Sequence, residues 1–470
     1  MTSRHARNES LRSRTCAGLL STTLFLGIAV ADVFAEATQP PTPNGTSVLP
    51  QGGFLSLQQS IDLAVTNHPV AQEGAANLRA SEARTEQIRS LYYPQVYANA
   101  DAAAGAARIN PRFVTPAGGL LQGNLGSYAI GVMASQRIYD FGYTQNLVES
   151  FELARRASAE DVTARRAVIS LHVQRAYLTS LKRKRLVQIA EDTVRERGVI
   201  AGQIETLYKQ QLKSKLDFSL ARVELVNAQS LLVKSRNALK ASYADLNRAM
   251  GVVGTDDYVL EDIAVDVRPQ GDLPELIADT LAHPEVKRAK EQAAAAEARV
   301  RAMKRQHLPT VSGIASAGSF DTFDPGRNVN TGGWWAAGAV ISMPLFTGFA
   351  IDNQVREAAA QYDAAQAAGA NIEQALTQQV TNAYLDTATF AQQITLAQDQ
   401  VQTAQEALTL AKQRYKLGLG TVVEVTQAEV AVTTAQTRLA EAQYDYKIAE
   451  VTLAYTTGLS TVERGDKTLR

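Results

Sequence analysis

The sequence is nearly free of cysteine and has no apolar run long enough to span a membrane as a helix. Its single cysteine, Cys16, precedes the longest uncharged apolar run, residues 17–31. The rest of the chain therefore offers no disulfide, thiol nucleophile or cysteine ligand. Because a spanning helix needs roughly 20 residues, any membrane insertion would have to use strands.

The chain also lacks an excess of either charge and has few aromatic residues. Lysine plus arginine number 47, as do aspartate plus glutamate, so nothing favours a nucleic acid as partner. Hydrophobic residues make up 45% of the chain but aromatic residues only 6%. This balance is typical of long helices with narrow seams rather than of one thick core.

No set of residues with catalytic or metal-binding spacing is present. His68 and His283 each precede a proline at a helix interruption, which indicates repeated local structure, and His172 and His307 lack plausible partners. There is no phosphate-binding glycine loop. We therefore predict no enzyme activity, no cofactor and no metal site.

Proline is missing from two long stretches, between Pro116 and Pro269 and after Pro344. An interior proline costs a helix about 3 kcal/mol, so these stretches predict long helices. A continuous helix over 143–207 would extend roughly 100 Å at about 1.5 Å per residue, which is too long for an ordinary globular domain.

The first 35 residues predict a secretory signal peptide. Four arginines precede the apolar run, and Val33 and Ala35 place small residues at the cleavage positions. A membrane anchor is the alternative, but the run is too short for one. Since Cys16 lies ahead of the run, we expect no lipid anchor. A flexible segment, 36–54, containing four prolines, would begin the mature chain.

The sequence indicates an internal duplication. The segment 414–430, RYKLGLGTVVEVTQAEV, matches 208–223 at an offset of 207, aligning Tyr208 with Tyr415. Earlier in each half, the two His-Pro pairs match at an offset of 215. We therefore predict two repeats. Their limits are 55–251 and 272–458, with a connector at 252–271 and a tail at 459–470.

Each repeat contains two stretches in which small or apolar residues alternate with others, as at Val96, Ala98 and Ala100. They predict strands of about ten residues, a length that suits a tilted membrane strand. A long helical hairpin follows each strand pair. The predicted strands are 95–107, 127–140, 310–321 and 333–345, and the hairpins are 143–250 with a tip near 209–215 and 349–457 with a tip near 416–421.

Four strands cannot close a membrane barrel alone. Closed barrels have eight or more strands, and an open sheet edge cannot sit in lipid. Several chains must therefore share one barrel. Trp334 and Trp335 lie near the loop ends of the strands, where they belong either to an interfacial belt or to ordinary packing.

The second long helix carries a heptad pattern in which large residues alternate with alanine over the later half. Such a narrow seam predicts helices packed side by side as a sheet or tube. The seam residues are Ala383, Thr387, Phe390, Ile394, Ala397, Val401, Ala404, Leu408, Ala411 and Tyr415.

The duplicated order, the strand exits Ile-Tyr-Asp-Phe-Gly and Pro-Leu-Phe-Thr-Gly, and the YKLGLGT turn together resemble the TolC family of outer-membrane efflux proteins. The resemblance implies a mainly α fold with membrane β. It implies a homotrimer with a twelve-stranded β-barrel in the outer-membrane lipid of a Gram-negative bacterium, continued by a periplasmic α-helical barrel. The implied partners are a periplasmic adaptor protein and an inner-membrane pump of the RND, ABC or MFS type.

The implied function is the exit duct of a tripartite efflux pump or a type I secretion system. Such a duct passively conducts substrates from the pump across the outer membrane. The same duct serves drugs, metals or secreted proteins, so the cargo stays open. The alternative is an exported coiled-coil or adhesin-like protein, which explains the heptads but not the strand pairs.

The resemblance also implies roles at the hairpin tips. Tyr415 would contact Asp217 on the neighbouring hairpin and help to hold the tunnel shut. Glu424 and Gln427 would line the entrance constriction, which leaves one carboxylate ring instead of two. The family's latch arginine falls at the position of Gly420, so that link is predicted to be missing.

Contact with the adaptor is implied for a second group of tip residues. From the residues alone, Glu424 and the tip lysines, Lys213 among them, are interpreted as solvated surface residues, and Gly418 and Gly420 as residues that serve the backbone geometry of the turn. The implied adaptor contacts are Gly418, Gly420, Thr421, Lys213 and Ser214.

Overall fold

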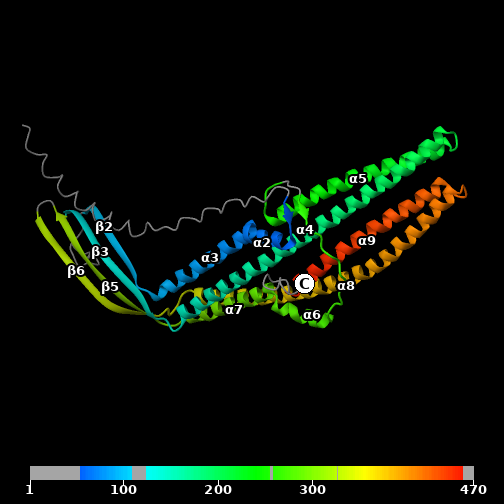
Figure 1. The fold of residues 1–470 in the computed structure, drawn as a ribbon. Helices are drawn as coiled ribbons and strands as arrows, with labels where there is room; N and C mark the ends of the chain where they lie inside the picture. Colours follow the sequence, from blue (N-terminus) through cyan, green and yellow to red (C-terminus); the bar gives the residue numbers. More distant parts are fainter. Residues whose placement is uncertain (1–52, 108–122, 255–257, 325–326, 459–470) are drawn as a thin grey trace, which may run out of the picture. The chain divides into compact units, whose positions relative to one another are not determined.

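The computed structural model describes residues 53–107, 123–254, 258–324 and 327–458. The predicted signal peptide, most of the 36–54 segment and the tail lie outside these ranges. Figure 1 shows the elements in chain order. They are β1(Phe54–Leu55), α2(Leu57–Asn67), α3(Pro69–Arg89), η1(Ser90–Tyr92), β2(Gln95–Ala107), β3(Gly123–Tyr139), α4(Tyr143–Lys209), α5(Lys215–Met250), β4(Val259–Leu260), α6(Leu273–Asp279), η2(Thr280–Ala282), α7(Pro284–Arg305), β5(Thr310–Asp324), β6(Arg327–Ser342), α8(Ala350–Lys416) and α9(Val422–Thr456).

The same order of elements occurs twice. Helix α3, strands β2 and β3, and helices α4 and α5 correspond to α7, β5 and β6, and α8 and α9. Helices α4 and α8 each contain 67 residues and no proline, so an unbroken backbone ladder runs along both. Each hairpin is therefore roughly 100 Å long.

The two His-Pro pairs have the same structural role. His68 and His283 cap α3 and α7, each accepting a hydrogen bond through Nδ1 from the N–H two residues on, at 3.2 Å. Gly251 and Gly458, which end the two hairpins with φ of 72° and 71°, approach the backbone of His68 and His283. This confirms that the histidines belong to repeated local structure.

The strands form one sheet in the order β2-β3-β5-β6, with every neighbouring pair antiparallel. Cross-strand partners point to the same face, so the register sorts the side chains into two sets. One face carries most of the polar residues, including Gln95, Asn99, Ser135, Arg137, Ser312 and Ser316. The other carries fewer polar residues and exposes Val96, Ile130, Val132, Trp335 and Ile341, while the polar face also exposes Tyr97, Met133, Ile314 and Val340.

The two tryptophans lie on opposite faces of this sheet. Trp335 is 82% exposed on the less polar face, where an interfacial belt would be. Trp334 is on the polar face, and its ring lies over the paired glycines Gly131 and Gly318. Because adjacent strand residues alternate faces, the two tryptophans cannot both belong to a belt on one face, and the belt stays a prediction.

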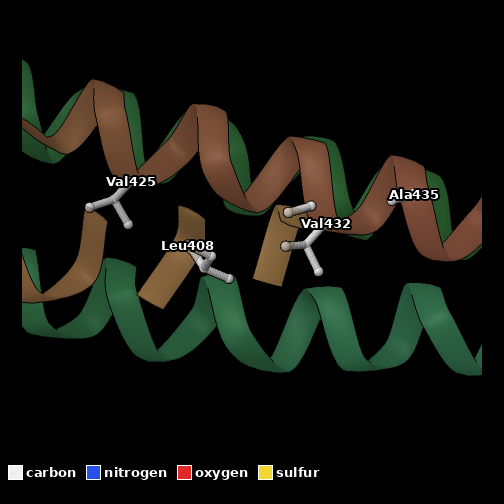
Figure 2. Packing of buried hydrophobic residues seen from close by; sticks show 5 residues of the cluster. Leu408, Val425, Val432 and Ala435 are labelled. Carbon is white, nitrogen blue, oxygen red and sulfur yellow. The ribbon is translucent and has the colours of Figure 1, made fainter. Parts of the chain in front are cut away.

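The predicted heptad seam is confirmed, since all ten of its residues are buried or half-buried in α8. Figure 2 shows Leu408 of α8 beside Val425 and Val432 of α9. Helix α4 packs against α5 and α9, and α8 packs against α9. The outer helices of this array are α5 and α8.

A small second sheet ties the N-terminal side of the described chain to the connector. Strand β1 pairs in parallel with β4, Phe54 opposite Val259 and Leu55 opposite Leu260. The Tyr177 hydroxyl lies 2.8 Å from the Leu55 carbonyl and 2.9 Å from that of Glu261. Phe54 is thus part of a strand, which corrects the flexible segment predicted there.

Candidate functional site: the hairpin tips

The tip of the second hairpin is a helix stop followed by a helix start. After α8, the Gly418 N–H donates to the Tyr415 carbonyl at 3.1 Å and the Leu419 N–H to the Arg414 carbonyl at 2.9 Å. Gly418 has φ of 73°, a left-handed conformation that glycine adopts at low cost. This geometry agrees with the interpretation from the sequence that Gly418 allows the backbone to turn.

The first tip makes the same turn without a glycine. Gln211 stands at the position that matches Gly418 and has φ of 63°. The Gln211 N–H donates to the Tyr208 carbonyl and the Leu212 N–H to the Leu207 carbonyl, both at 2.9 Å. A side chain in this region costs roughly 1–2 kcal/mol, so the first tip is the more strained of the two.

Exchanging the turn residues should reverse this difference. We expect Gln211→Gly to slow amide exchange at Leu212 about fivefold, because it removes roughly 1 kcal/mol of strain. Gly418→Gln should speed exchange at Leu419 by a similar factor. Hydrogen exchange read by mass spectrometry measures both amides. If Gln211→Gly leaves the Leu212 rate unchanged, the strain is absent.

The next helices begin at matching caps. Ser214 Oγ accepts from the Asp217 N–H at 3.1 Å, and the Asp217 carboxylate accepts from the Ser214 N–H and hydroxyl. Thr421 Oγ1 accepts from the Glu424 N–H at 3.3 Å. Ser214, Asp217, Thr421 and Glu424 therefore start α5 and α9 as capping residues.

Tyr415 and Asp217 form no hydrogen bond in the described structure, so the latch implied by the resemblance is not made through the Tyr415 hydroxyl here. The Asp217 carboxylate is engaged in the cap of α5, and the buried Tyr415 hydroxyl has no hydrogen-bond partner among the described residues. Instead the Lys213 ammonium lies 4.4 Å from the centre of the Tyr415 ring. This cation–π contact joins the two hairpins at the tip.

Glu424 is 45% exposed, and its carboxylate pairs with Arg414 Nε at 3.5 Å. Gly420 packs beside this pair: a Cβ there would lie 3.2 Å from Glu424 Oε2 and from the Arg414 Cβ. A larger residue at this position would have to displace one of them. Gln427 is exposed one turn further along α9.

A groove of about 940 Å³ runs between the two hairpins just behind the tips. Its lining combines apolar side chains with five charged ones, four of them basic and one acidic. The lining consists of Arg195, Glu196, Val199, Ile200, Gln203, Ile204, Thr206, Leu207, Lys213, Lys412, Tyr415, Lys416, Gly418, Val422 and Val425.

Two buried charges lie beside the groove. The Arg197 guanidinium donates to Glu224 at 2.7 Å, and the Lys412 ammonium lies 3.5 Å from Glu429 Oε1. The sequence analysis missed both pairs. A visible signal was the carboxylate of Glu429 within the apolar spacing of α9, between Val425 and Val432.

Two other kinds of feature are absent from the described ranges. No group of three or more histidine, cysteine, aspartate or glutamate side chains there is arranged to hold a metal ion. Among the helices of these ranges, none combines the length and apolar character of a membrane span.

Comparison with known proteins identifies the family. The model of the family described as outer membrane efflux protein matches residues 60–252 and 278–459. The outer membrane efflux protein BepC of Brucella suis is 22% identical over 407 residues, covering 85% of each chain. The outer membrane protein TolC of Escherichia coli is 22% identical over 433 residues, covering 86% of this chain and 84% of TolC.

A solved structure shows the same fold. The outer membrane protein VceC of Vibrio cholerae superposes with a TM-score of 0.72 at 20% identity, over 86% of this chain and 96% of VceC. The chain therefore belongs to the outer membrane efflux protein family, which confirms the predicted TolC family and outer-membrane exit duct and leaves the adhesin alternative without support.

Proposed function

We propose that three copies of this chain share one twelve-stranded barrel and one helical tunnel, and that this duct receives its cargo from an inner-membrane pump through a periplasmic adaptor. The observation that carries the proposal is the sheet of four strands with unpaired outer strands, β2 and β6. In lipid both edges need partners. Because all neighbours are antiparallel, β6 of one copy can pair with β2 of the next.

The helical hairpins support the same assembly. Helices α5 and α8 lie at the two sides of the array, and each exposes apolar residues that are seven or fourteen positions apart, with one further step of three on α5. A heptad stripe without a partner in its own chain is suited to another copy, and two different edges that meet head to tail can close a ring. The residues are Leu216, Val223, Val226 and Val233 on α5, Leu396 and Leu410 on α8, and Leu417 directly after α8, all at least 53% exposed.

Native mass spectrometry of the detergent-extracted outer-membrane fraction tests the assembly. We expect three copies per particle. Val226→Glu places a charge in the α5 stripe and should dissociate the particle, whereas Val253→Glu, in the exposed connector, should not. A single-copy mass, or recovery in the soluble periplasm, would rule the shared duct out.

The tip is the proposed docking end for the adaptor. Gly418, Gly420, Thr421, Lys213 and Ser214 form the two turns, and Lys213 lies beside the basic groove. A photo-crosslinker placed at Gly418 or Lys213 should capture an adaptor in living cells. Identification of the captured proteins would also reveal the pump class and hence the cargo class.

Glu424 is proposed to line the constriction, with Gln427 one turn further on. Three carboxylates around a narrow bore attract multivalent cations, but Arg414 partly neutralises each of them here. We expect Glu424→Gln to weaken block of single-channel current by a trivalent cation about fivefold, and Arg414→Gln to strengthen it, since an exposed pair contributes up to about 1 kcal/mol. Equal block in wild type and Glu424→Gln would remove Glu424 from the bore.

A further inference from the structure

The contact between α4 and α9 joins the two hairpins of one copy. The polar interactions that cross it differ between the end near the sheet and the end near the tip. Nearer the sheet, bonds cross it: Arg175 Nη2 donates to Thr452 Oγ1 at 2.8 Å, and Lys182 pairs with Asp445 at 2.7 Å. Further toward the tip, the hydroxyls of Thr193 and Thr433 are 3.4 Å apart.

Between Thr193 and the tip, no hydrogen bond or ion pair of the described residues crosses this contact; Ile204 packs against Val422 there, and the cation–π contact of Lys213 with Tyr415 joins the tips. The antiparallel register that places Thr193 beside Thr433 also places Ile204 beside Val422, so Arg197 lies opposite Glu429. Arg197 is 8% exposed and Glu429 is 6% exposed. In the described structure neither side chain forms a hydrogen bond or ion pair with the other hairpin.

Each of these buried charges is paired within its own hairpin. Arg197 of α4 bonds to Glu224 of α5, and Glu429 of α9 pairs with Lys412 of α8. Arg197 Nε and Glu429 Oε1 have no hydrogen-bond partner, since Lys412 is within ion-pair distance of Glu429 but not aligned for a hydrogen bond. Separating the hairpins here would break no ion pair and would hydrate two unsatisfied polar atoms.

We propose that Arg197 and Glu429 are positioning residues for opening of the tip: the two hairpins of one copy part at this level, while Arg175 with Thr452 and Lys182 with Asp445 keep them joined nearer the sheet. This inference rests on the proposed function as a duct. Oε1 of the buried Glu429 carboxylate has no hydrogen-bond partner in the closed seam and gains water when the hairpins part, which reduces the free-energy difference between the closed and the parted seam.

The protonation of Glu429 is linked to this opening. Burial raises the pKa of Glu429 despite the attraction of Lys412 and Arg197, and Glu196 on α4 raises it further. Glu224 is the remaining charged group nearby, and its carboxylate is bonded to Arg197. In a parted, hydrated seam the pKa returns toward its ordinary value. The closed seam therefore binds the proton more tightly, so acidification favours closure and the effect is lost as pH rises through the raised pKa.

Thiol labelling measures the opening directly. Thr193→Cys places a thiol of similar size in the seam, where Thr193 is 6% exposed, and the predicted mature chain contains no other cysteine. Glu429→Gln removes the buried charge and leaves Lys412, whose side chain is 39% exposed, free to turn to water. We expect Glu429→Gln to slow labelling of the seam thiol about tenfold.

Three comparisons make the result specific. Glu429→Met should also slow labelling, and it replaces Glu429→Gln if that variant does not fold. Glu441→Gln, on the same helix, should leave the labelling rate unchanged. Thr434→Cys places a thiol at an exposed position of the same helix, and its labelling rate at each pH is the reference that corrects the seam rates for ionisation of the thiol. After this correction, labelling of the seam in wild type should fall on acidification, and in Glu429→Gln it should not.

Equal labelling rates in wild type and Glu429→Gln, or the same pH dependence in both, would overturn the proposal. The assay needs only folded protein in detergent. A seam that responds as expected in a protein that conducts no current would therefore contradict the proposed duct and not the seam.

Discussion

Replacing Gly318 by alanine is expected to remove most of the assembled protein from the outer membrane. Gly318 lies in β5, opposite Gly131 of β3 and Trp334 of β6. A Cβ at this position would lie 2.6 Å from the Ile130 carbonyl oxygen and 2.9 Å from the Gly131 Cα. Both are backbone atoms and cannot move without separating the strands.

The effect should be large because β3 and β5 join the strand pairs of the two repeats. Overpacking costs about 1–3 kcal/mol where side chains can adjust, and we expect at least about 3 kcal/mol where the backbone must move. The Trp334 ring, which covers both glycines, would be displaced as well.

Gly338→Ala is the matched control. Gly338 lies in the neighbouring strand β6, and a Cβ there meets nothing within 4 Å. The oligomer recovered from the outer membrane, measured on semi-native gels, should fall to a small fraction for Gly318→Ala and stay at the wild-type amount for Gly338→Ala. Equal amounts for both variants would show that the β3–β5 contact tolerates a side chain.

Tyr177→Phe is expected to loosen the small sheet that ties the connector to the hairpins. Tyr177 is fully buried, and its hydroxyl lies within hydrogen-bond distance of the carbonyls of Leu55 and Glu261. Phenylalanine leaves both carbonyls without this partner, at a cost of about 2 kcal/mol. Burial raises the pKa of Tyr177 to about 12, so this contribution is complete below the ordinary tyrosine pKa and is lost only as pH rises through the raised value.

The Glu261 amide reports this change, because its N–H donates to the Leu55 carbonyl at 3.2 Å. We expect its exchange to accelerate about 30-fold in Tyr177→Phe, which corresponds to about 2 kcal/mol. Tyr384 is the equivalent residue of the second repeat, half-buried and without a described hydrogen bond. Tyr384→Phe should leave the rate unchanged. The same acceleration in both variants would mean that the Tyr177 hydroxyl does not hold β1 and β4 together.

The elements that follow from periodicity were predictable. Long proline-free stretches indicated α4 and α8, the offset of 207 indicated the paired tips, and alternation indicated the strands. Alternation follows from the two-residue period of a strand, and the absence of proline follows from the hydrogen bond that an interior proline would remove from a helix. Family membership followed from the order of these elements along the chain.

The side-chain pairs between distant segments were not predictable in the same way. Asp217 was expected to meet Tyr415, but a carboxylate three residues after Ser214 satisfies the free N–H groups of its own helix first. The pairing of Phe54 with Val259 was not predictable, because strands of two residues are too short to show a periodic pattern. Glu429 was overlooked because a single acidic residue in a seam says nothing of its partners.

Single-channel recording in a planar bilayer tests the central claim most directly, namely that copies of this chain form one passive duct. Purified wild-type protein should produce unitary current steps of uniform size without nucleotide or any other energy source, and Val226→Glu, which we expect not to assemble, should produce none. Absence of steps from wild-type particles that contain three copies would contradict the duct.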